Sequence, residues 1–65
     1  RLLVNIGDLV RSQSDVDKDI EGPLGILVDI DRKKSGEPIV YYVFLFKWGT
    51  IESFNVFYSK LVKFK

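Results

Sequence analysis

The sequence contains neither cysteine nor histidine. Without cysteine, no disulfide and no thiolate metal site can stabilise the chain, and this composition fits a reducing compartment. Without histidine or cysteine, the usual pairs of nucleophile and general base are missing, and no glycine-rich phosphate loop is present in the sequence. We therefore expect a protein that is not an enzyme and that holds no cofactor and no metal ion.

Long apolar runs are absent as well. No run approaches the roughly 20 residues that cross a bilayer, and the short runs are interrupted by glycine, aspartate and lysine. We therefore expect no signal peptide, no transmembrane segment and no membrane partner. The net charge of +1 favours no class of ligand, although the charged side chains of residues 1–31 are mostly acidic and those of residues 32–65 mostly basic.

The chain is short, and its 65 residues predict a single domain. A chain of this length buries only about 60% of the surface that its unfolded form exposes, so its stability is small. The apolar residues (46%) and the aromatic residues among them (14%) must hold the fold together, or a partner subunit must contribute.

Short β-branched and aromatic segments, separated by turn residues, predict an all-β fold. The polar and acidic residues 12–21 predict a long loop, Gly22-Pro23 predicts a turn, and residues 58–61 predict one helical turn before the last strand. The segments predicted as strands are Leu9–Arg11, Ile26–Asp31, Ile39–Phe46, Ile51–Asn55 and Val62–Phe64. Five short strands with one long loop are typical of a small barrel, because closure removes exposed sheet edges.

The alternation of apolar and polar residues predicts which side chains form the core. In Ile26–Asp31, apolar residues at every second position alternate with Leu27 and two aspartates, which is the pattern of a half-buried strand. We therefore expect one buried cluster, formed by Val10, Ile26, Val28, Ile30, Val43 and Leu61.

The segment Ile39–Trp48 is apolar on both of its faces. A small barrel has one interior, so the second face needs cover from the N-terminal residues 2–6 or from a second copy of the chain. We expect self-association, or a larger assembly, that buries part of a group of aromatic side chains: Tyr42, Phe44, Phe46 and Trp48.

The order of these signals resembles that of SH3-like barrels of the Tudor and KOW type. In those modules a Gly-Asp-hydrophobic-Val opening precedes an alternating strand, a second strand ends in an aromatic-Gly turn, and a Ser-x-Leu turn leads into the last strand. The corresponding segments cover nearly the whole chain and are Gly7–Val10, Gly25–Ile30, Tyr42–Gly49 and Tyr58–Leu61. The resemblance implies a single five-stranded SH3-like barrel with one short helical turn.

The sequence is also similar to small uncharacterised proteins of tailed bacteriophages. Those proteins combine the same opening with a Gly-Ile-Val strand and a Tyr-Val-aromatic strand before glycine; the chain has Gly25-Ile26 and Tyr42-Val43-Phe44 at the matching places. This resemblance implies a virion component or an accessory protein of a phage.

Tudor domains that bind methylated ligands hold the methylammonium group in a cage of aromatic rings by cation–π attraction. Trp48 stands where these modules often have one cage residue, but Leu45 stands at a second position, and Leu9–Arg11 offers no aromatic residue. The resemblance therefore implies an incomplete cage.

The acidic run Asp15-x-Asp17-x-Asp19-x-Glu21 has carboxylates at alternate positions, as calcium-binding loops do. Such loops require glycine at their sixth position and glutamate at their twelfth, which here are Ile20 and Ile26. We therefore interpret residues 12–21 as a solvated acidic loop.

Two kinds of partner remain open. Exposed aromatic residues would bind another protein, and we expect a protein-interaction or assembly module whose binding residues are Tyr42, Phe44, Phe46, Trp48, Arg32, Lys33 and Lys34. The alternative is a nucleic-acid-binding module of KOW or Tudor type, in which the basic residues contact phosphates and the aromatic residues stack on bases. Salt distinguishes the two, because contacts with phosphates weaken steeply as the salt concentration rises.

Overall fold

The computed structural model describes residues 4–14, 21–57 and 59–64, and this part of the chain contains five β-strands and no helix. All strand pairings are antiparallel. The strands are β1 (Leu9–Ser14), β2 (Glu21–Arg32), β3 (Pro38–Leu45), β4 (Thr50–Asn55) and β5 (Ser59–Lys63). The prediction of an all-β chain with five strands is confirmed.

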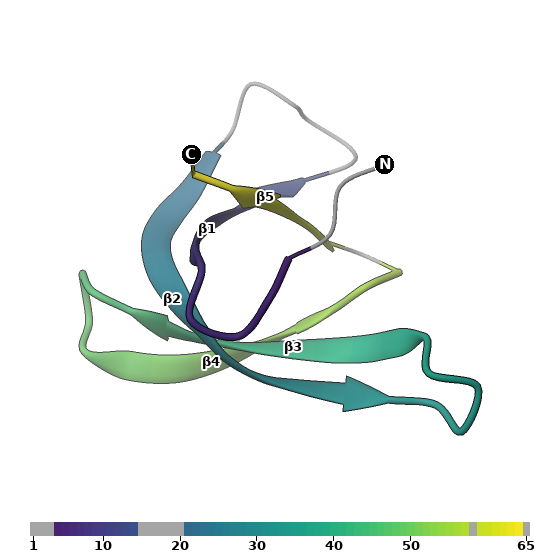
Figure 1. Ribbon diagram of the computed structural model, residues 1–65. Coiled ribbons are helices and arrows are strands. Elements are labelled where there is room, and N and C mark those ends of the chain that lie inside the picture. The colour runs from purple at the N-terminus through teal and green to yellow at the C-terminus, as the bar shows by residue number, and fades with distance from the viewer. Residues whose placement is uncertain (1–3, 15–20, 58, 65) are drawn as a thin grey trace.

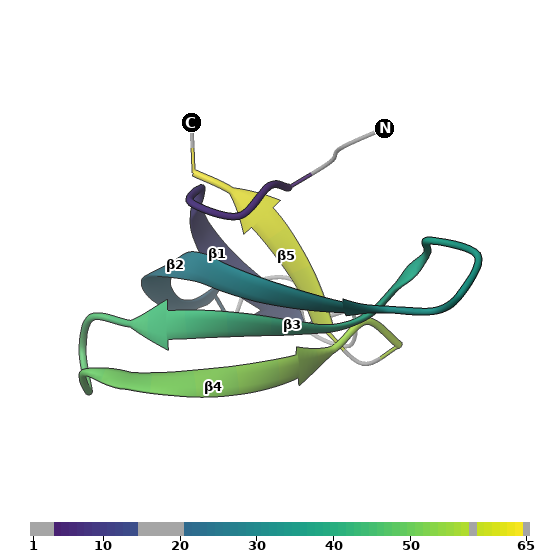
Figure 2. The same ribbon diagram turned by 60° about the horizontal axis from the view of Figure 1, so that its bottom comes forward.

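The five strands form one sheet in the order β4-β3-β2-β1-β5. β2 has 12 residues, twice as many as β1, and its two halves pair with different neighbours. Residues 21–26 pair with β1, and residues 25–32 pair with β3. Because β2 bends between these halves, β1 and β5 lie across one face of the layer formed by β3 and β4 (Figures 1 and 2). The core lies between these two layers.

A bulge near the start of β2 contributes to this curvature. Opposite Ser12 of β1, the β2 strand has two residues, Gly22 and Pro23. Proline has no N–H group to donate to the ladder, and a bulge is one of the few places where a strand tolerates it. The predicted turn at Gly22-Pro23 is therefore wrong, because both residues belong to β2.

Gly25 lies where β1, β2 and β3 meet, opposite Val10 on one side and Leu45 on the other. A Cβ atom at this position would collide with the carbonyl oxygen of Phe44 and would lie 2.6 Å from Cγ1 of Val43. Only a residue without a side chain allows β2 to approach β3 this closely.

A second bulge, at Val28, changes the phase of β2. Leu27 lies opposite Val43, and the next pair begins at Asp29, which leaves Val28 outside the ladder. One extra residue moves all following side chains to the opposite face of a strand. Leu27 before the bulge and Ile30 after it therefore both contact the core, although they are three residues apart.

The buried core agrees with the predicted cluster on β1, β3 and β5 but not on β2. Val10, Val43 and Leu61 are buried, and Ile30 is partly buried against them. Ile26 is half-buried on the outer face, and Val28 is 37% exposed, so their predicted burial is wrong. The core is completed by residues that the prediction lacked: Leu27 and Leu45, with Val4, Tyr41 and Phe54 packed against them.

Two further predictions differ from the structure. The helical turn predicted for residues 58–61 is wrong for Ser59–Leu61, which belong to β5, and Tyr58 lies outside the described residues. The loop predicted for residues 12–21 is too long, because residues 12–14 extend β1 and Glu21 begins β2. The aspartates of the acidic run, at positions 15, 17 and 19, lie outside the described residues.

Candidate binding surface

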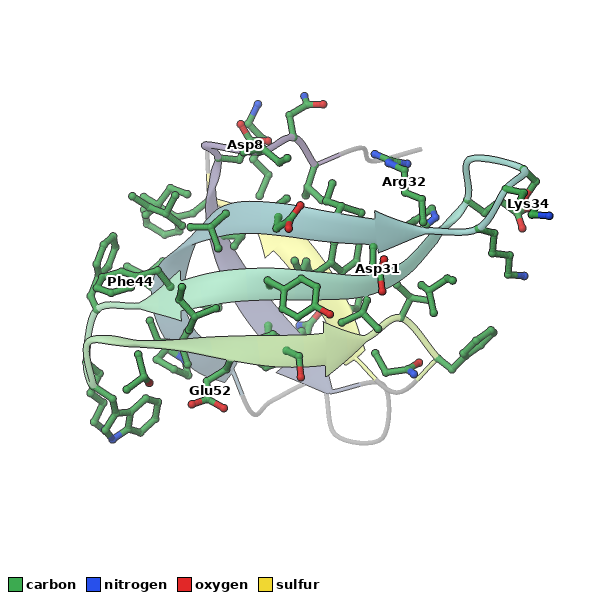
Figure 3. All side chains as sticks on the ribbon, turned by 90° about the horizontal axis from the view of Figure 1, so that it is seen from below. Asp8, Asp31, Arg32, Lys34, Phe44 and Glu52 are labelled. Carbon is green, nitrogen blue, oxygen red and sulfur yellow. The ribbon has the colours of Figure 1, made fainter. Side chains whose placement is uncertain are left out.

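The structure separates the residues predicted to bind a partner into two groups. Tyr42 and Phe44 lie on the outer face of β3, and Phe46 and Trp48 lie in the loop that joins β3 to β4. The basic residues 32–34 lie at the other end of the sheet, where β2 turns into β3. Figure 3 shows this separation, with Phe44 near one end of the strands and Arg32 and Lys34 near the other.

An apolar row crosses the outer face at the end near Phe44. The row consists of Ile26, Phe44 and Ile51, which are direct neighbours on β2, β3 and β4. The ring of Phe46 meets that of Phe44 edge-on, with ring centroids 6.1 Å apart. The next row is polar, because Tyr42 lies between Asp29 and Ser53. The row of Ile26, Phe44 and Ile51 is therefore confined to the end of the sheet next to the β3–β4 loop.

The loop of residues 46–49 holds two aromatic side chains in solvent. Gly49 adopts a left-handed conformation (φ +65°), and its N–H donates to the carbonyl oxygen of Leu45 at 2.8 Å. This tight closure leaves Phe46 50% exposed and Trp48 57% exposed. The ammonium group of Lys47 lies 5.2 Å from the centre of the Trp48 ring, within cation–π distance.

A groove of about 450 Å³ opens on the inner side of the sheet next to this loop. It lies between the β1–β2 bulge and the inner face of β3 and β4. The residues that line it are Ser12, Pro23, Leu45, Trp48, Glu52, Ser53 and Phe54. Only Trp48 was predicted as a binding residue. Pro23 and Phe54 come together because β2 bends, whereas the sequence pattern at Gly22-Pro23 indicates a turn and not a bend within one strand.

The basic residues at the β2–β3 turn are engaged within the turn itself. Arg32 Nη1 donates to the carbonyl oxygen of Gly36 at 2.7 Å, and the Lys33 ammonium lies 3.6 Å from the Glu37 carboxylate. Two aspartates, at positions 29 and 31, lie on the adjoining part of β2. The three cations of residues 32–34 are thus accompanied by three acidic side chains, which weakens the positive potential at this end.

The opposite layer carries a small cavity that the sequence did not indicate. Its volume is about 110 Å³, and it is lined by Arg11, Gln13, Val62, Lys63 and Phe64. The Arg11 guanidinium lies 5.3 Å from the centre of the Phe64 ring, and the Lys63 ammonium is 4.0 Å from the Asp8 carboxylate. The cavity is small and its charged side chains interact with their neighbours, so we regard it as part of the packing of β1 on β5.

Two further observations bear on the kind of site. Within the described residues, acidic side chains do not gather in groups of three or more that could hold a metal ion. The same part of the chain contains no helix with the length and hydrophobicity needed to cross a membrane.

Comparison with known proteins gave no relatives: neither a family model, nor a curated protein, nor a solved structure matches the chain.

Proposed function

We propose that the chain is a non-enzymatic SH3-like barrel and that it acts as a protein-interaction or assembly module. The barrel part of the proposal is supported by the strand order, in which β5 lies beside β1, and by the bent β2 that the two layers share. The segments that resemble Tudor and KOW modules fit the same architecture.

The binding part of the proposal depends mainly on one observation. Trp48 is 57% exposed and lines the inner groove, at the end of the sheet that carries the outer apolar row. Tryptophan is among the residues that most often contribute a large share of the binding energy in protein interfaces. Phe46 and Ile51, both at least half exposed, lie at the same end of the sheet, and we call these three side chains the apolar surface.

Nucleic-acid binding receives less support from the same geometry. A module that binds nucleic acid combines exposed rings with a continuous basic surface. Here the rings of Phe46 and Trp48 lie at one end of the sheet, and the cations of residues 32–34 lie at the other, beside Asp31 and Glu37. We therefore propose a protein as the partner.

A random peptide array, read at about 50 and 200 mM salt, tests the proposal. The variant Phe46→Ser/Trp48→Ser removes the apolar surface, and Phe57→Ser is the matched control, because Phe57 is 70% exposed and lies in the turn after β4. We expect the wild-type chain and the control to retain the same peptides at both salt concentrations and the double variant to lose them. Retention by all three chains would refute the proposal.

A further inference from the structure

In the part of the chain that the structure describes, one edge of β4 carries no neighbouring strand. Among the described residues, β4 pairs only with β3. The N–H of Val56 donates to the carbonyl oxygen of Ile39 at 3.0 Å, which fixes the phase of the ladder. Because backbone groups alternate in direction along a strand, Ile51, Ser53 and Asn55 direct their N–H and C=O groups away from β3.

The other outer strand, β5, differs in its charges. β5 carries Lys60 and Lys63, and lysine on an edge strand discourages the addition of another strand. β4 has the sequence Thr-Ile-Glu-Ser-Phe-Asn, with neither lysine nor proline. Glu52 is its only charged residue. β4 is therefore the edge that is better suited to accept a further strand.

The groove lies directly beside this edge. Glu52 and Phe54 lie opposite Val43 and Tyr41, so their side chains share the inner face, and both line the groove. Ile51 and Ser53 lie on the outer face. A strand added at the edge of β4 would place every second side chain in the groove and the others beside Ile51.

Glu52 determines which strand fits. Its carboxylate accepts a hydrogen bond from the Thr50 hydroxyl at 3.2 Å and otherwise faces solvent; Figure 3 shows the side chain on the side of β4 away from β3. An apolar or acidic residue placed opposite Glu52 would remove water from its carboxylate and leave the Thr50 hydroxyl to compensate the charge, which is costly. A lysine or arginine would pair with it.

A second copy of the chain fits this edge poorly. In an antiparallel pair of β4 strands related by a two-fold axis at position 52, the two Glu52 side chains would lie directly opposite each other. Like charges in that position destabilise a strand pair. The charge of the edge thus favours a basic partner over self-pairing in this register.

We propose that the open edge of β4 binds an extended segment of another protein by strand addition and that Glu52 selects a basic residue in that segment. This inference rests on the function proposed above and specifies its partner. In an antiparallel addition, four consecutive residues of the partner face Phe54, Ser53, Glu52 and Ile51 in turn. The residues that face Phe54 and Ile51 should be apolar, and the residue that faces Glu52 should be basic. Any residue can face Ser53.

Two labelled peptides test the inference, Thr-Val-Thr-Lys-Val-Thr and the same sequence with glutamate in place of lysine, each flanked by Gly-Ser. Binding is measured by fluorescence anisotropy to the wild-type chain, to Glu52→Lys and to Glu37→Lys. The last variant makes a charge reversal of equal size at the far end of the sheet. Circular dichroism establishes that each variant is folded, and Glu52→Gln replaces Glu52→Lys if the latter is not.

We expect the wild-type chain and Glu37→Lys to bind the lysine peptide about tenfold more tightly than the glutamate peptide, the ratio that one charge-assisted pair supplies. Glu52→Lys should invert this preference, and Glu52→Gln should remove it. In hydrogen exchange, the lysine peptide should protect the amides of Ile51, Ser53 and Asn55.

Equal affinity for the two peptides, no binding of either, or protection on β5 instead of β4 would overturn the inference. The inference would also be overturned if the β4 amides were protected in the absence of peptide and the chain sedimented as a dimer, because a second copy would then occupy the edge. The double variant Phe46→Ser/Trp48→Ser could lose the array peptides while the lysine and glutamate peptides bind with equal affinity. In that case only the strand addition fails, and the proposed function stands.

Discussion

Leu27 of β2 lies directly opposite Val43 of β3, and the two side chains are almost completely enclosed, with 0% and 1% of their surface exposed. The bulge at Val28 follows this pair and changes the face of the later side chains of β2, so that Ile30 contacts the same core as Leu27. The next residue, Val28, is exposed, so replacements at the two positions should differ in their effect on the free energy of unfolding.

Replacement of Leu27 by alanine should lower the free energy of unfolding by about 2–5 kcal/mol, because it leaves a cavity at the centre of the core. Replacement of Val28 by alanine should cost less than about 1 kcal/mol, since Val28 is 37% exposed. Urea unfolding followed by circular dichroism measures both. A larger loss for Val28→Ala than for Leu27→Ala would show that β2 has the alternation that the sequence suggests and no bulge.

Replacement of Gly25 by alanine should destabilise the fold by about 1–3 kcal/mol or more, because the new methyl group meets the Phe44 carbonyl oxygen and the Val43 side chain. Gly36→Ala is the control. It has open space around its Cβ position but a left-handed φ of +95°, so it should cost about 1 kcal/mol. Thermal melts compare the two variants, and equal losses would contradict the close approach of β2 and β3.

The fluorescence of Trp48 should report on the binding surface. Trp48 is the only tryptophan of the chain and is 57% exposed, so the free protein should emit at the wavelength of water-exposed indole and be quenched efficiently by acrylamide. A peptide that occupies the groove should shift the emission to shorter wavelength and reduce quenching. Emission typical of a buried indole in the monomer would contradict the exposed position of this ring.

Titration with single-stranded DNA should show weak binding that disappears as salt rises. The cations at positions 32–34 are accompanied by acidic residues on the same hairpin, including the Lys33–Glu37 pair at 3.6 Å. We therefore expect affinities no better than the roughly 10⁻⁴–10⁻⁶ M of non-specific binding at physiological salt. Nanomolar affinity that falls with Lys34→Glu would instead support the nucleic-acid alternative.

The sequence by itself determined the class of fold and most of the strands. β-branched and aromatic residues in Pro38–Leu45 and Thr50–Asn55 favour extended backbone strongly, and the predicted limits of these strands agree with the structure to within one residue. The inward positions of Val43 and Leu45 follow from simple alternation, because β3 is regular from Val40 to Leu45. Trp48 could be identified as a candidate because it directly precedes a glycine at the end of a strand.

The tertiary structure alone decided the core face of β2 and the composition of the groove. Whether a strand contains a bulge depends on how it pairs with the neighbouring strand. The alternation of Ile26, Val28 and Ile30 in the sequence therefore did not indicate that Leu27 is buried. Ser59–Leu61 form a strand because β1 pairs with them, although their local sequence suggests a turn. Glu52 and Pro23 line one groove only because β2 bends and carries its first half over the inner face of β4. Pairing across strands depends on residues far apart in the chain, and local sequence patterns do not contain that information.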